Sequence, residues 1–135
     1  MGYWNDSLLV GDSMIDDQHR KLVGSIEKLM DACKNGKAKD EIGRLLNYTV
    51  TLIKEHFRDE ENLQERCAFP GLATHKRLHA QFIMSIDTLH NEFKQTGPNV
   101  AMTGKLSVAL ADWFINHIVA EDKKVGEYIH KSSGK

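Results

Sequence analysis

Four stretches of this chain carry apolar residues at alternating spacings of three and four, the pattern of helices that bury one face. They cover about residues 16–35, 40–67, 72–95 and 100–129. Proline, which breaks helices, occurs only twice in 135 residues, and both copies fall in the connections. No useful segment alternates polar and apolar residues, so no strand is expected. Short connections make successive helices antiparallel, which predicts an all-α, up-down-up-down four-helix bundle.

The first fifteen residues lack this periodicity and are expected to form an irregular N-terminal arm that packs on the bundle. Asp16 or Asp17 is the expected N-cap of the first helix, because a short acidic side chain accepts hydrogen bonds from free backbone N–H groups. We therefore expect one bundle domain over residues 16–135, preceded by the arm at residues 1–15.

Charge and composition exclude several classes of protein. Lys and Arg total 18 and Asp and Glu total 19, so the net charge of −1 gives no electrostatic case for nucleic acid or an anionic membrane. No stretch approaches the roughly 20 apolar residues of a membrane span, and the N-terminus does not resemble a signal peptide. Two cysteines without a CxxC pattern suit a reducing compartment. These features predict a cytoplasmic protein.

The inner faces of the helices hold polar side chains where leucine is usual. Six such positions are occupied by His19, His56, Glu60, His75, His79 and His117. A buried imidazole or carboxylate is costly unless it is paired, hydrogen-bonded or bound to a metal. One such residue could simply have found a hydrogen bond, but six on four helices need a common explanation.

The topology provides that explanation, because in an up-down-up-down bundle all six positions fall in one layer toward one end. His56 and Glu60, like His75 and His79, are four residues apart and lie one above the other on their helices. Imidazoles and carboxylates converging in one layer predict a metal site.

Asp122 is a seventh candidate, five residues after His117. An ideal helix would place the two about 140° apart. We expect either a local π-type widening of the helix near residues 117–122, or an Asp122 side chain that reaches the layer from its side. The alternative is that Asp122 is a surface acid beside two lysines.

The combined series resembles the ligand motifs of bacterial hemerythrins. The motifs are IDDQHRKL, HFRDE, HKRLH and HIVAED, and the resemblance covers essentially the whole chain. It implies two iron ions, Fe2+ or Fe3+, with a bridging oxo or hydroxo group. One iron would take His75, His79 and His117, the other would take His19 and His56, and Glu60 and Asp122 would bridge both.

Counting ligands under this resemblance leaves one open position, on the iron with two histidines. The open position suits O2 or another small diatomic ligand. The implied function is reversible O2 binding there, for oxygen carriage, storage or delivery, without enzyme activity or a catalytic residue. The apolar pocket implied by the family is formed by Leu22, Phe57, Trp113, Phe114 and Ile118. No protein partner is identified.

Three other functions stay open. The same centre could serve an enzyme acting on peroxide or nitric oxide, or the O2-sensing module of a larger receptor. Iron storage or zinc binding is the third, although ferritin-like bundles use more carboxylate and less imidazole, and imidazole alone does not select iron over zinc.

Overall fold

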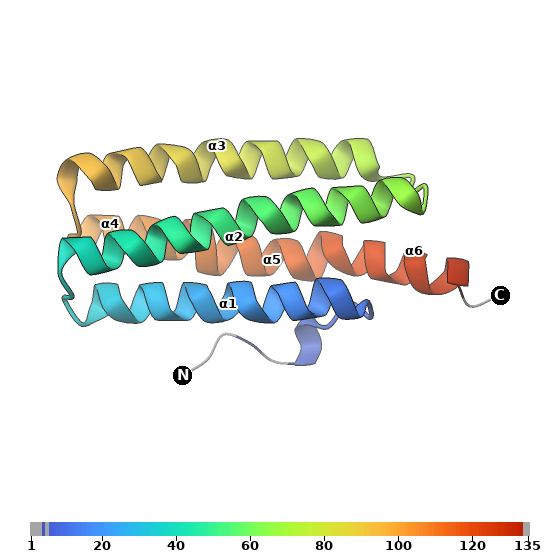
Figure 1. The fold of residues 1–135 in the computed structure, drawn as a ribbon, viewed down its shortest axis with the longest axis horizontal. Coiled ribbons are helices and arrows are strands. Elements are labelled where there is room, and N and C mark those ends of the chain that lie inside the picture. Colours follow the sequence, from blue (N-terminus) through green and yellow to red (C-terminus); the bar gives the residue numbers. More distant parts are fainter. Residues whose placement is uncertain (1–3, 5, 134–135) are drawn as a thin grey trace.

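Four helical rods pack as an antiparallel bundle, as the sequence predicts (Figure 1). The computed structural model describes residues 4 and 6–133, apart from the side chains of residues 118, 119, 132 and 133. The described residues contain no strand. The first three rods are single helices, α1 (Ser13–Lys34), α2 (Lys39–Arg66) and α3 (Leu72–Thr96). The fourth combines α4 (Val100–Leu106), η2 (Ser107–Phe114), α5 (Ile115–His117), η3 (Ile118–Asp122) and α6 (Lys123–Ser133).

The start of α1 differs from the prediction. The N-cap is Asp12, whose carboxylate accepts a hydrogen bond from the Ile15 amide at 3.1 Å. The expectation of an N-cap at Asp16 or Asp17 was wrong. Asp16 is buried inside the helix and accepts hydrogen bonds from the amides of Val10 (2.8 Å) and Gly11 (3.2 Å). It therefore caps free N–H groups of the arm, a role that its residue type alone does not distinguish from helix capping.

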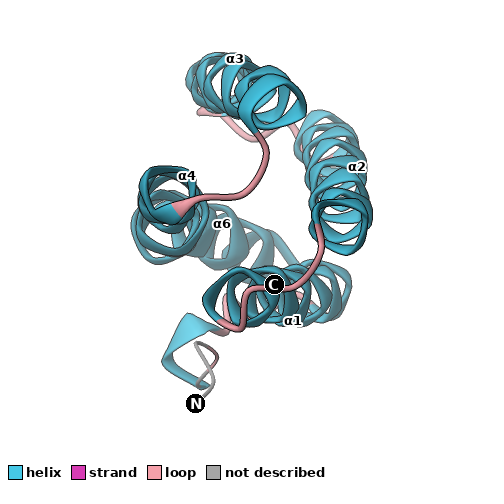
Figure 2. Ribbon diagram, turned by 90° about the vertical axis from the view of Figure 1, so that its left-hand side faces the viewer, coloured by secondary structure: helices cyan, strands magenta, loops and turns pink. Residues whose placement is uncertain are grey.

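The arm is fastened to the bundle by burial and by one close approach. It contains a short 3-10 turn, η1 (Asp6–Leu8), that lies outside α1 (Figure 2). Leu8 and Val10 are buried, and Gly126 of α6 makes room for the arm, because a Cβ atom there would lie 1.9 Å from the Val10 carbonyl oxygen. The arm thus contacts both α1, through Asp16, and α6, through Gly126.

The fourth rod is not a regular α-helix. Its backbone runs as a π-helix through η2 and again through η3, which ends at Asp122. The second of these confirms the predicted widening after His117, and the first was not expected from the sequence. A π-helical turn contains one more residue than an α-helical turn, so Asp122 comes round to the face that carries His117.

Away from the predicted layer the core is apolar. Fully buried side chains such as Ile26, Leu46, Ile86 and Leu106 fill the half of the bundle near the connection between α1 and α2. The polar layer lies toward the opposite end, where α1 and α3 begin and α2 ends. None of the described helices is both long enough and apolar enough to cross a bilayer.

Candidate metal centre

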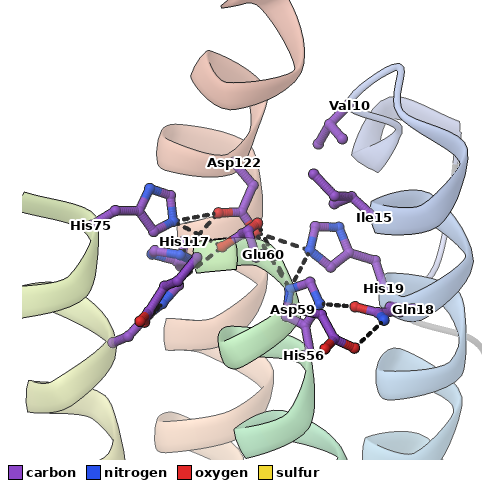
Figure 3. Close-up of polar contacts among 12 residues, drawn as sticks. Val10, Ile15, Gln18, His19, His56, Asp59, Glu60, His75, His117 and Asp122 are labelled. Carbon is purple, nitrogen blue, oxygen red and sulfur yellow. Dashed lines mark hydrogen bonds and ion pairs between the residues drawn. The ribbon is translucent and has the colours of Figure 1, made fainter. Parts of the chain in front are cut away.

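All seven side chains singled out in the sequence meet in one buried cluster. Figure 3 labels each of them except His79. His19 comes from α1, His56 and Glu60 from α2, and His75 and His79 from α3, while His117 and Asp122 come from the fourth rod. None is more than 4% exposed. The predicted convergence is therefore present, and Asp122 is fully buried, not a surface acid.

The cluster divides into two groups that share their carboxylates. In each group the potential ligand atoms lie within 4.8 Å of one another. One group contains three histidines, and the other contains two; we call them the three-histidine and two-histidine groups. Their members are His75, His79 and His117 in the first, His19 and His56 in the second, and Glu60 and Asp122 in both.

Each shared carboxylate directs its two oxygens to different groups. Oδ1 of Asp122 lies 2.9 Å from His75 Nε2 and 3.0 Å from His117 Nε2, whereas Oδ2 lies 2.9 Å from His19 Nε2. Glu60 is arranged in the same way: Oε1 lies 3.0 Å from His75 Nε2, and Oε2 lies 3.8 Å from His56 Nε2. Such a division is what a carboxylate bridging two metal ions requires.

Only some of the inward-facing polar atoms satisfy one another: His75 Nε2 pairs with Asp122 Oδ1 at 2.9 Å, and the Nε2 atoms of His19 and His56 lie 3.1 Å apart. Both Glu60 oxygens, Oδ2 of Asp122, and Nε2 of His79 and of His117 are buried without a hydrogen-bond partner among the described residues. Several lie at hydrogen-bond distances, yet their angles are not those of hydrogen bonds. Buried polar atoms are normally paired, so lone pairs that converge without pairing fit a metal better than a hydrogen-bonded core. Imidazole and carboxylate donors suit iron.

The electrostatics of the cluster keep the carboxylates ionised. Burial raises the pKa of the Asp122 carboxyl, but the close contacts of four nearby imidazoles outweigh it and hold that pKa well below its ordinary value. Burial and the charge of Asp122 raise the pKa of Glu60, and His75 and His79 reverse this and lower it. The two negative charges therefore persist in the interior, where a cation would stabilise them.

Three residues outside the predicted set support the histidines from behind. Nδ1 of His56 lies 2.6 Å from Oε1 of Gln18, whose amide nitrogen donates to Asp59 at 3.0 Å. Nδ1 of His79 lies 2.7 Å from a carboxylate oxygen of Glu61. These contacts join different helices, so no spacing within one helix could have indicated them.

The residues of the expected apolar pocket are distributed over both groups. The Phe114 ring lies edge-on to His19 and His56, with centroids 6.2 and 6.4 Å away. Phe57 stacks on His79 at 3.7 Å, and Trp113 stacks on His117 at 5.2 Å. Leu22 is buried and, with His56 and Gln18, lines a cavity of about 90 Å³ between α1 and α2. The side chain of Ile118 lies outside the described part of the chain.

The whole bundle matches a known domain. Residues 10–129 fit the family model of the Hemerythrin HHE cation binding domain. The chain belongs to the hemerythrin family. As a member, it is a non-haem iron protein. The predicted resemblance to bacterial hemerythrins is thereby confirmed.

Hemerythrin-family relatives align over most of the chain. Bacteriohemerythrin of Stenotrophomonas maltophilia (strain R551-3) is 29% identical over 126 residues, which cover 93% of this chain and 80% of that protein. Bacteriohemerythrin of Pseudomonas aeruginosa (strain LESB58) is 33% identical over 119 residues, covering 88% and 75%. A crystal structure of a hemerythrin mutant with one leucine replaced by alanine superimposes with a TM-score of 0.80 at 26% identity, covering 93% of this chain and 94% of that one.

Proposed function

We propose that the cluster holds two iron ions and that O2 binds reversibly at one open position of the pair. The observation that carries this proposal is the division of the carboxylate oxygens of Glu60 and Asp122 between the two groups of histidines. The three-histidine group would hold one iron, the two-histidine group would hold the other, and both carboxylates would bridge them.

Counting coordination positions explains why one ligand can bind. Two six-coordinate ions offer twelve positions in all, of which the five histidines occupy five and the two bridging carboxylates four. A bridging oxo or hydroxo group takes two more, and one position is left. It falls in the two-histidine group. When bound, the iron pair supplies this position and the electrons that a diatomic ligand draws on.

The chain's own residues hold the imidazoles in place and keep the surroundings dry. Phe114 faces both histidines of the two-histidine group, and Leu22 and Phe57 are buried beside His56. Trp113, which stacks on His117, and Ile118, whose side chain lies outside the described part of the chain, are assigned to the proposed pocket by the family resemblance. Apolar walls limit the access of water and so favour reversible binding over irreversible oxidation. Carriage, storage or delivery of O2 follows from such binding, and no catalytic residue is assigned.

Iron analysis and gas titration test this function. We expect about two irons per chain and, after anaerobic reduction, a visible charge-transfer band that forms with O2 and disappears when O2 is removed. His79→Ala should lower the iron content, whereas His90→Ala, a change of a half-buried histidine outside the cluster, should leave it unchanged. A single iron per chain would refute the proposal. If the protein consumed peroxide or nitric oxide over many turnovers, the proposal of reversible O2 binding would give way to an enzymatic function.

A further inference from the structure

The histidines of the two groups differ in what accepts a hydrogen bond from the ring nitrogen that faces away from the centre. In the three-histidine group, His79 Nδ1 lies 2.7 Å from the Glu61 carboxylate. In the two-histidine group, His56 Nδ1 lies 2.6 Å from the neutral amide of Gln18. The other member, His19, has a buried Nδ1 without a hydrogen-bond partner among the described residues. Within the described part of the chain, only the first group therefore has a negative charge bonded directly to the back of one of its rings.

Asp59 fixes the direction of the hydrogen bonds behind His56. An ionised carboxylate only accepts, so the amide nitrogen of Gln18 must face Asp59, at 3.0 Å. The amide oxygen then faces the ring, and His56 must donate from Nδ1. Glu61 imposes the same direction on His79. In both rings this leaves the lone pair of Nε2 directed into the cluster, as a metal ligand requires.

The two acceptors act differently on the ring that they hold. A carboxylate attracts the Nδ1 proton more strongly than an amide does, which makes the imidazole a more basic ligand. A more basic ligand stabilises the higher oxidation state of the metal it binds. Asp59 also carries a negative charge, but Gln18 separates it from the His56 ring, and 36% of the Asp59 side chain is exposed to solvent.

We propose that Glu61 and Gln18 are positioning residues that make the two metal positions unequal, so that the three-histidine iron is oxidised first and the two-histidine iron second. This inference rests on the proposed two-iron centre. The iron that is harder to oxidise is the one with the open position. Gln18 thereby helps to keep ferrous the position at which O2 binds.

Two sets of isosteric substitutions move the charge without changing the shape of the side chains. Glu61→Gln gives His79 a neutral acceptor. The double substitution Gln18→Glu with Asp59→Asn keeps the net charge and lets the new amide donate to the new carboxylate, so that His56 acquires a charged acceptor. Glu55→Gln is the matched control, because Glu55 is an exposed carboxylate on the same helix that lines the cavity beside His56.

The readout is the pair of one-electron midpoints in an oxidative titration of the iron-loaded, fully reduced protein. In each step one electron passes from a ferrous iron to the electrode mediator. Glu61→Gln should raise the first midpoint potential by ~59 mV, which corresponds to about a tenfold change in the equilibrium constant of that one-electron step, and should leave the second midpoint potential unchanged. The double variant should lower the second midpoint by a similar amount and leave the first. Glu55→Gln should move neither.

Iron content separates this inference from the proposed function. If the unsubstituted protein does not hold two irons per chain, the proposed function fails. If it does, and Glu61→Gln behaves like Glu55→Gln, the inference is overturned. It is also overturned if the double variant moves the first midpoint and not the second.

Discussion

Gln64 has a completely buried side chain, and its unpaired amide lowers the free energy of unfolding of this fold. It lies one helical turn after Glu60 on α2, and neither its amide nitrogen nor its amide oxygen has a hydrogen-bond partner among the described residues. A buried polar group left unpaired costs about 1–3 kcal/mol. Methionine is similar in length, loses similar rotamer freedom on burial and needs no hydrogen bond. Gln64→Met should therefore raise the free energy of unfolding by about 1–3 kcal/mol.

Urea unfolding followed by circular dichroism measures this gain. With a denaturant slope of about 2 kcal/mol per molar, the midpoint should rise by roughly 0.5–1.5 M. Gln18→Met is the matched control: its half-buried amide is hydrogen-bonded on both sides, so the midpoint should fall. A lower midpoint for Gln64→Met would refute the reasoning, because it would show that the amide is paired in solution, for instance with a buried water.

Three further predictions concern the ligands, the arm and the pH response. Asp122→Asn replaces one of the two oxygens by which Asp122 faces both groups, so metal analysis should find at most one iron per chain, whereas Asp16→Asn should keep two. Gly126→Ala forces a Cβ against the arm backbone and should lower the free energy of unfolding, measured by thermal unfolding, by about 1–3 kcal/mol. Gly24→Ala, which meets nothing within 4 Å, should raise it by up to ~1 kcal/mol. Burial lowers the pKa of His75, but its close contacts with the carboxylates of Asp122 and Glu60 raise it to about 10, above its unfolded value of 6.5. The protonated ring therefore contributes fully to the free energy of unfolding below pH 6.5, and this contribution is lost as pH rises through 10. The melting temperature of iron-depleted protein should fall over that range. Iron-loaded protein, in which the neutral ring binds the metal, should not show this fall.

The bundle and the cluster were predictable because their signals are local. The spacing of three and four fixes which face of each helix is buried, and every histidine of the cluster lies on such a face. The step of five between His117 and Asp122 fits no regular α-helix, and of the arrangements that this misfit left open the structure has the π-helical turn η3. The up-down-up-down topology then places the polar positions of all four helices in the same layer of the bundle.

Features that depend on contacts between helices were not predictable in this way. The partners of His56 and His79 lie 38 and 18 residues away in the chain, and their choice depends on how each helix is rotated about its axis. Nothing in residues 107–114 distinguishes the π-helical η2 from an α-helix. Gln64 was overlooked because the periodicity fits its neighbour Leu63 equally well, and only the packed structure shows which of the two is fully buried.

The carboxylates of Glu61 and Asp59, which lie outside the cluster, also help to explain how the fold tolerates a charged centre in its interior. With two ferrous ions, two carboxylates and a bridging hydroxide, the proposed centre carries one net positive charge, and oxidation adds to it. A buried charge is costly unless an opposite charge is near. Glu61 lies directly behind His79, and Asp59 lies behind Gln18, which contacts His56; 24% and 36% of the two carboxylate side chains remain exposed. They can offset the charge of the centre without losing all of their own hydration, which two more buried acids could not do.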